Sequence, residues 1–270
     1  MEIQWSLVFF TLLVCMGCGL FGAIAAVGLG KANFVSKAGV VAALIILVAG
    51  GLSSVLHLAH PFKAIYVLTN LNTELGKEML LMAVTGVLMI IYLLRIDNAS
   101  DGARKTICVL AVVFAALTAF QAGLTYILVA RPSWNTYLLP LSYLASACAM
   151  GCIAFGLIAK GASDQARARM RLASFMAVIA LGILYLAYVS ASFTSVGADA
   201  SFIASSDGLT YFWGGVLLCG IVLPFILLFP HHRISSLKAA LPLAFLCVLI
   251  GGIAFRSMKY LLGGSFPLVL

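Results

Sequence analysis

The segment KAGVVAALIILVAGGL, residues 37–52, decides the fold class. It has no charged residue after Lys37, and it belongs to an apolar run from 38 to 58, which is about the length a helix needs to cross a bilayer. The whole chain is similar: of its 270 residues, 64% are hydrophobic and 9% are charged, and the mean hydropathy is +1.17. Soluble domains carry about 25% charged residues. The solvent of this chain is therefore lipid.

Apolar runs of spanning length recur along the chain. They lie at 5–29, 38–58, 77–95, 106–129, 137–159, 172–192, 209–229 and 238–257. None alternates apolar and polar residues, so transmembrane strands are excluded. Glu2, with no basic residue before Trp5, argues against a cleavable signal. We predict an all-α integral membrane protein, a single domain over 1–270 with about eight transmembrane helices.

The basic residues predict the orientation of the helices, because lysine and arginine are enriched in cytoplasmic loops. Eleven flank one set of loops: Lys31, Lys37, Arg95, Arg104, Lys105, Lys160, Arg167, Arg169, Arg171, Arg233 and Lys238. Five flank the other set: Lys63, Lys77, Arg131, Arg256 and Lys259. Both termini are therefore expected outside, in a multi-pass protein of the cytoplasmic membrane. The net charge of +8 reflects this topology, and we expect no nucleic-acid partner.

Metal and haem sites are not expected. The cysteines are spread over apolar runs at spacings that suit helix packing, and no loop has the spacing of an iron–sulfur cluster. Haem needs opposed histidines at one depth, whereas His57 and His60 follow one helix and His231 and His232 another, at opposite ends of the membrane. We therefore predict no haem and no metal ligand in this chain.

Ion transport is disfavoured, because the centres of the runs contain no Asp, Glu, Lys or Arg. The most notable deep polar side chain is Gln121, with Thr118 and Thr125 nearby. An interhelical hydrogen bond is the preferred interpretation of Gln121.

The stretch from Ser53 to Glu78 contains the candidate chemistry. His57 precedes Pro61, where a helix ends or kinks, and Glu78 opens the next run. Each residue has an ordinary interpretation: an interfacial histidine, and a carboxylate favoured by a helix dipole. The pair also suits a quinol, whose hydroxyl an imidazole binds and deprotonates. These alternatives remain open on the residues alone.

The same stretch resembles the membrane-anchor subunit family of dimethyl sulfoxide reductase and related molybdenum oxidoreductases. That family shows S-x-L-H-L-G-x-P-x-R-A, then L-x-N-L and S-x-L-S-R-E. The matching residues are Ser54, Leu56, His57, Leu58, Pro61, Ala64, Leu68, Asn70, Leu71, Leu75 and Glu78. Lys63 and Lys77 stand where the family has arginine, which keeps the charge but not bidentate recognition.

A second, weaker resemblance lies in GGIAFRSMKY, residues 251–260. It is similar to the family's G-E-x-x-G-R-x-x-F-Y and keeps Gly251, Arg256 and Tyr260. Gly252 replaces the glutamate, and Lys259 replaces the phenylalanine.

The resemblance implies a haem-free anchor that oxidises menaquinol at the outer face. Electrons would pass to an iron–sulfur subunit and then to a molybdopterin catalytic subunit in anaerobic respiration. It implies that His57 and Glu78 are the catalytic quinol residues, with Lys63, Arg256 and Tyr260 as quinol neighbours or docking contacts. Such an anchor does not act on the terminal substrate, although it carries the quinol-oxidation site of an oxidoreductase complex.

Three alternatives remain: a polysulfide- or nitrite-reductase-type quinol-oxidising anchor, a purely structural anchor, and an ion-translocating subunit. The sequence identifies neither the terminal acceptor nor the quinone.

Overall fold

The computed structural model describes residues 2–29, 36–55, 67, 69–159, 163–194, 200–230 and 239–263. These ranges contain eight helices of spanning length and no strand, which confirms the predicted fold class. Each of the first six spans is one continuous α-helix: α1 (Trp5–Gly28), α2 (Lys37–Val55), α3 (Glu74–Arg95), α4 (Asp101–Leu124), α5 (Leu138–Ile158) and α6 (Asp164–Thr194). The others are the seventh span, made of η3 (Gly208–Val222) and α7 (Leu223–Leu228), and α8 (Ala240–Leu262). A short 3₁₀ helix, η2 (Ala200–Ala204), precedes η3.

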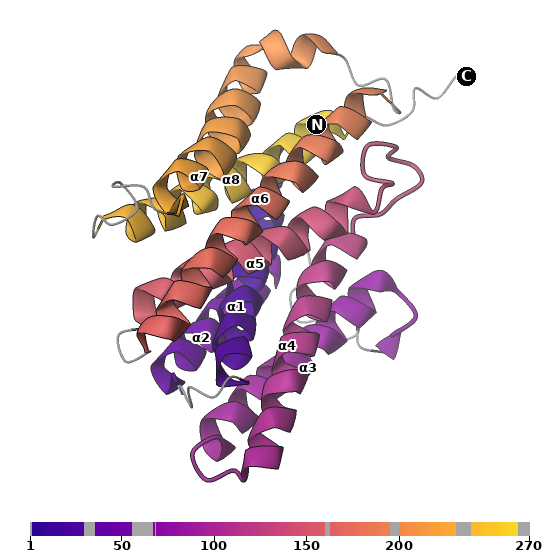
Figure 1. Ribbon diagram of the computed structural model, residues 1–270. Helices are drawn as coiled ribbons and strands as arrows, with labels where there is room; N and C mark the ends of the chain where they lie inside the picture. The colour runs from indigo at the N-terminus through magenta and orange to yellow at the C-terminus, as the bar shows by residue number, and fades with distance from the viewer. Residues whose placement is uncertain are drawn as a thin grey trace.

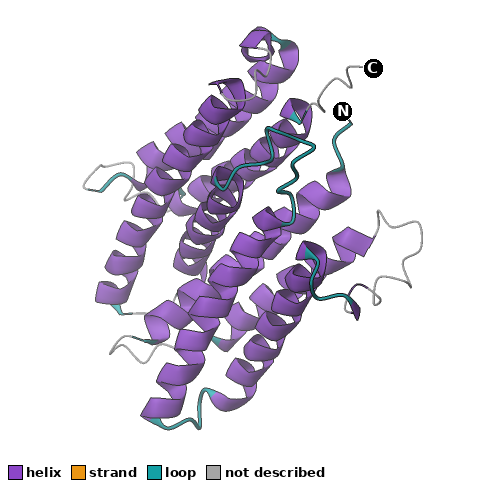
Figure 2. Cartoon of the chain, turned by 90° about the vertical axis from the view of Figure 1, so that its right-hand side faces the viewer, coloured by secondary structure: helices purple, strands orange, loops and turns teal. Residues whose placement is uncertain are grey.

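Successive helices run in opposite directions, so α1 begins and α8 ends at the same end of the bundle (Figure 1). We call this the terminal end, and the other the opposite end. Figure 2 shows the helices lying side by side, with loops at the two ends. Which end faces the cytoplasm remains a prediction from the basic residues.

Helices α1 and α5 form the centre of the bundle. In the most apolar stretch of α1, 67% of the residues are buried, whereas 28% are buried in the corresponding stretches of α2 and α3. Small residues allow α1 and α5 to meet closely, because a Cβ at Gly19 would collide with the backbone of Ala147, and one at Gly151 with the backbone of Gly19. This crossing fixes the two helices that later carry Thr11 and Tyr143.

The seventh span is wound as a π-helix over η3, a geometry that is usually limited to single turns. Its glycines lie against α8: a Cβ at Gly215 would collide with Ala254, and one at Gly251 with Gly220. The close contact holds η3 and α8 together without large side chains between them.

Large apolar side chains on the outer helices face away from the core. Ile45, Leu52, Leu94 and Ile183 are all exposed. In water such surface would be unfavourable, whereas in a bilayer it contacts the acyl chains.

Two helices extend beyond their predicted ends. α6 begins at Asp164 rather than 172, because Ser163 caps it by accepting a hydrogen bond from the Ala166 backbone N–H (3.2 Å). α8 continues to Leu262 rather than 257, so Arg256 and Lys259 lie inside the helix and are buried. When these two buried residues are not counted, three basic residues instead of five remain on the predicted outer side, against eleven on the predicted cytoplasmic side. The difference in basic residues between the two sides is therefore larger than in the count from the sequence alone.

Candidate functional site

Glu78 lies on the first turns of α3, near the terminal end, and only 1% of it is exposed. The helix begins there because the Thr73 side chain accepts a hydrogen bond from the Gly76 backbone N–H (3.0 Å). The Glu78 Oε2 atom accepts a hydrogen bond from the Thr125 hydroxyl (2.8 Å). No described residue donates to its Oε1 atom. One carboxylate oxygen therefore remains available to a further donor.

Helix α4 holds α3 in place through the predicted interhelical hydrogen bond of Gln121. Its Nε2 atom donates to the Glu74 side chain (Oε2, 2.8 Å) and backbone carbonyl (3.2 Å). Deeper in the bundle, the hydroxyls of Thr85 and Thr118 are hydrogen-bonded at 2.8 Å. These contacts fix the register of the two helices and bring Glu78 beside Thr125.

A second buried group, Lys259 of α8, lies among aromatic rings. Its Nζ atom is 3.1 Å from the centroid of the Tyr126 ring and 4.5 Å from that of Tyr260, with Trp134 and Tyr143 at 4.9 and 5.8 Å. It also donates a hydrogen bond to the Tyr143 hydroxyl (3.3 Å). We call these four rings the aromatic cage. Burial raises the pKa of the Tyr126 phenol well above its usual value, so the cage presents neutral rings to an ammonium.

Arg256, one helical turn deeper, has no exposed surface and forms hydrogen bonds with neutral oxygens. Its Nε donates to the Thr11 hydroxyl (3.1 Å), and its Nη1 to the Gly252 carbonyl (3.1 Å) and the Ser146 hydroxyl (3.5 Å). The guanidinium also lies 4.4 Å above the Tyr143 ring. Arg256 therefore joins α8 to α1 and α5.

The charges of this region do not balance among the described residues. Arg256 and Lys259 are fully buried, and Glu78 is the buried carboxylate near them. The charges of Glu78 and Lys259 interact, but no described ion pair joins them directly. Isolated buried charges are costly in a membrane and occur mainly at functional positions. Ionisable residues therefore extend about two turns into α8, although the centres of the described spans contain no Asp, Glu, Lys or Arg, as the sequence indicated.

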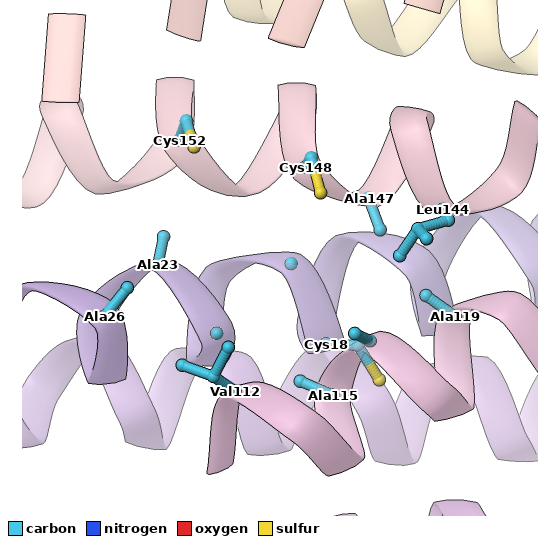
Figure 3. A pocket seen from close by; sticks show the side chains of 13 residues that line it. Cys18, Ala23, Ala26, Val112, Ala115, Ala119, Leu144, Ala147, Cys148 and Cys152 are labelled. Atoms are coloured by element: carbon cyan, nitrogen blue, oxygen red, sulfur yellow. The ribbon is translucent and has the colours of Figure 1, made fainter. Parts of the chain in front are cut away.

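A groove of about 190 Å³ lies between α1, α4 and α5 (Figure 3). Its lining is apolar and consists of small side chains, with Ala119 and Leu144 toward the terminal end. From these two residues the groove runs toward the opposite end, along Ala23 and Cys152. It is open to the lipid, because Ala26 and Cys148 on its walls are exposed. An extended apolar chain fits such a groove.

The family of polysulphide reductase NrfD membrane proteins matches residues 2–262 of the chain. The chain belongs to the NrfD family. Members of this family are quinol-interacting membrane anchor subunits of molybdoenzyme complexes, and they partner with iron–sulfur and molybdopterin subunits. No curated protein matches the chain.

In this NrfD-family protein, three of the five predicted site residues lie at the terminal end: Glu78, Arg256 and Tyr260. His57 and Lys63 lie outside the described residues. In the sequence His57 follows Val55, the last residue of α2, by two positions. Because Arg256 is fully buried, it is not a docking contact for a soluble subunit, and that part of its predicted role is wrong.

Sequence reasoning missed Lys259 and its aromatic cage. In a helix that continues to Leu262, residues 256, 259 and 260 lie on one face. Extending the predicted helix to that residue would therefore have placed Lys259 beside Arg256 and Tyr260. Nothing in the local sequence indicates that Tyr126 and Trp134, more than 120 positions away, supply the rings.

Proposed function

We propose that this NrfD-family protein is the haem-free anchor of a dimethyl sulfoxide reductase-type complex in the cytoplasmic membrane. It oxidises menaquinol at the terminal end, which faces outward. The electrons pass to an iron–sulfur subunit and then to a molybdopterin subunit. The whole chain acts as one domain.

The observation that carries this proposal is the Oε1 atom of Glu78, which is buried without a described donor, near a buried ammonium. A quinol needs an acceptor for its protons at the membrane boundary, and a carboxylate with an open oxygen provides one. A carboxylate whose only role is to cap a helix would be expected at the surface instead.

The reaction releases two electrons and two protons from each quinol. In the proposed sequence the His57 imidazole binds a head-group hydroxyl and accepts its proton, since imidazole is the side chain best suited to general-base chemistry near neutral pH. Glu78 receives the proton next and passes it to water at the terminal end, and the second proton follows the same route. Both electrons leave for the iron–sulfur subunit. The ammonium of Lys259 attracts negative charge at this end of the bundle.

The groove of Figure 3 is proposed to hold the isoprenoid tail. The groove is almost wholly apolar, and Ala119 and Leu144 lie at the side of it that faces the terminal end, so a tail lying in it would extend from that end of the bundle toward the opposite end. Small side chains leave room for a methyl-branched chain, and the lateral opening gives access from the bilayer.

The soluble partners are proposed to dock on the terminal end. The loop between α4 and α5, residues 125–137, and the helix η2 lie there. The predicted docking loops 59–76 and 193–208 include residues outside the described ranges, and their described residues 69–76 and 200–208 lie at the same end. Electron transfer requires the iron–sulfur subunit to approach the quinol ring, and this end is where the candidate site lies. The segment at Arg256 is not included, because it is buried.

A second candidate is a polysulfide-reductase-type anchor, which the name of the polysulphide reductase NrfD family favours. It would use the same quinol site with a different catalytic partner. The purified complex separates the two, since reduction of dimethyl sulfoxide but not polysulfide supports the first, and the reverse supports the second.

The test of quinol oxidation compares two electron donors in the purified complex. His57→Ala should abolish menaquinol-driven turnover and leave turnover driven by an artificial dye unchanged, because the dye reduces the catalytic subunit directly. Full quinol-driven turnover in the assembled His57→Ala complex would leave a structural or ion-translocating anchor as the better account. A reduced-minus-oxidised spectrum should show no b-type haem bands from this subunit.

A further inference from the structure

The opposite end of the bundle holds a basic cleft that quinol chemistry does not use. Two adjoining cavities, of about 570 and 170 Å³, both have Arg167 and Arg171 in their walls. Asp164, the ion-pair partner of Arg167, and Leu228 at the end of α7 also line the larger cavity, so its net charge is about +1. Phe155 of α5 and Leu241 of α8 line the smaller. We call the two together the basic cleft.

The length of α6 places this cleft at the boundary of the hydrocarbon. Its 31 residues span roughly 46 Å, whereas the bilayer core is about 30 Å thick. The polar stretch from Asp164 to Arg171 forms the first two turns, and apolar residues begin at Leu172. Both arginines therefore lie at head-group level, with Leu172 and Leu228 of the same cavity at the start of the apolar layer.

The two arginines are arranged to hold an anion. They are four residues apart, so they project from one face of α6. A guanidinium binds phosphate oxygens through two parallel hydrogen bonds. Arg167 is paired with Asp164, whereas no described residue forms an ion pair with Arg171. The positive end of the α6 dipole lies at the same place and adds to the attraction.

We propose that the basic cleft binds an anionic phospholipid. Its phosphodiester lies between Arg167 and Arg171, and its acyl chains lie along Leu172 and Leu228. A lipid fits this cleft better than a free anion does, because the arginines lie at head-group level and Leu172 and Leu228 lie next to the apolar layer. A free anion would make no favourable contact with the two leucines. The proposal does not depend on the quinol site. It agrees with the predicted topology, because anionic lipid attracts basic residues on the cytoplasmic side.

The test uses the purified full chain in detergent, titrated with phosphatidylglycerol or phosphatidylcholine and followed by native mass spectrometry. Phosphatidylglycerol should bind more tightly than phosphatidylcholine. Arg167→Gln and Arg171→Gln should each weaken phosphatidylglycerol binding by ~5-fold, the contribution of one basic residue near a membrane surface. The matched control is Arg169→Gln, which removes the same charge from an exposed residue outside both cavities and should change binding by less than ~2-fold.

Several results would overturn the proposal. Equal losses for Arg169→Gln and Arg171→Gln would show a diffuse surface charge instead of a site. Equal binding of the two lipids would remove the anionic requirement. Competition by inorganic phosphate, or by glycerophosphoglycerol, at the concentration of the lipid would show a free-anion site. Arg171→Lys keeps the charge but not the two parallel hydrogen bonds, so it should bind phosphatidylglycerol more weakly than the parent chain and more tightly than Arg171→Gln. Binding by a folded Arg171→Lys chain that is no tighter than that of Arg171→Gln would also contradict the account.

Discussion

The Nζ atom of Lys259 lies 3.1 Å from the centroid of the Tyr126 ring, in the interior of a membrane protein. The cation comes from the last helix and the ring from the loop that follows α4. Electrostatic attraction to aromatic faces offsets part of the cost of removing the ammonium from water. The arrangement keeps a positive charge near Glu78 without a direct ion pair, so the carboxylate stays open to another donor.

Lys259→Met tests the role of that charge, because methionine keeps much of the side-chain volume and removes the ammonium. We expect menaquinol oxidation to fall by ~10-fold, which corresponds to the loss of about 1.4 kcal/mol of charge interaction in the transition state. Dye-driven turnover should not change. The control is Lys77→Met, which removes an exposed lysine paired with Glu74 on the same end of α3. Equal menaquinol-driven turnover of Lys259→Met and Lys77→Met would show that the charge of Lys259 plays no part in quinol oxidation.

Ala116→Phe tests the tail groove by placing a ring into its lumen. The variant should raise the KM for a long-tailed menaquinol by ~10-fold, as expected if about two buried methylene groups of the tail lose their contacts. The KM for a tail-less quinol should be unchanged. Leu117→Phe, at an exposed lipid-facing position of the same helix, is the matched control. A loss of affinity for both quinols would show that the groove holds no tail.

Gly151→Ala tests the crossing of α1 and α5. The added methyl would meet the backbone of Gly19, which has no side chain to move, so we expect a loss of about 1–3 kcal/mol in stability. Thermal unfolding in detergent should show a lower Tm. Gly86→Ala, with nothing within 4 Å of the added Cβ, should leave the Tm unchanged or raise it slightly. The same Tm for both variants would contradict the close approach of these helices.

Reporter fusions test which end is cytoplasmic. A fusion after Arg171 should report a cytoplasmic location, because the eleven basic residues of the predicted inner loops exceed the three that remain outside. A fusion in the 125–137 loop should report the outer side. Reversal of both signals would move the quinol site and the docking face to the cytoplasm.

The fold class could be predicted from the sequence, because membrane-spanning helices are recognised by the length and hydrophobicity of their apolar runs. The interhelical role of Gln121 was also predictable, since a deep amide in lipid must find a partner. Helix ends were harder to predict, because they depend on polar residues that a hydropathy criterion counts against a helix. Asp164–Arg171 and residues 258–262 are helical, yet they lie outside the predicted runs 172–192 and 238–257 for this reason.

The candidate site was only partly predictable. Glu78 follows from a local motif, so it was found from the sequence. Lys259 depends on rings from two distant segments, and this contact arises only when α8 packs against the α4–α5 loop. Arg256 was found, but its burial against Thr11 was not, because no local pattern pairs the first helix with the last.

The central claim is that Glu78 relays protons from menaquinol, and Glu78→Gln tests it most directly. Glutamine keeps the shape and the hydrogen bond from Thr125 but cannot accept a proton. The measurement is menaquinol-driven turnover of the assembled complex together with the Kd of a quinol-analogue inhibitor, with Glu74→Gln on the same helix as the control. We predict a fall in turnover of at least ~100-fold, in line with general acid–base catalysis, a change in Kd below ~3-fold, and near-normal turnover for Glu74→Gln. Near-normal turnover of Glu78→Gln in an assembled complex would contradict the account.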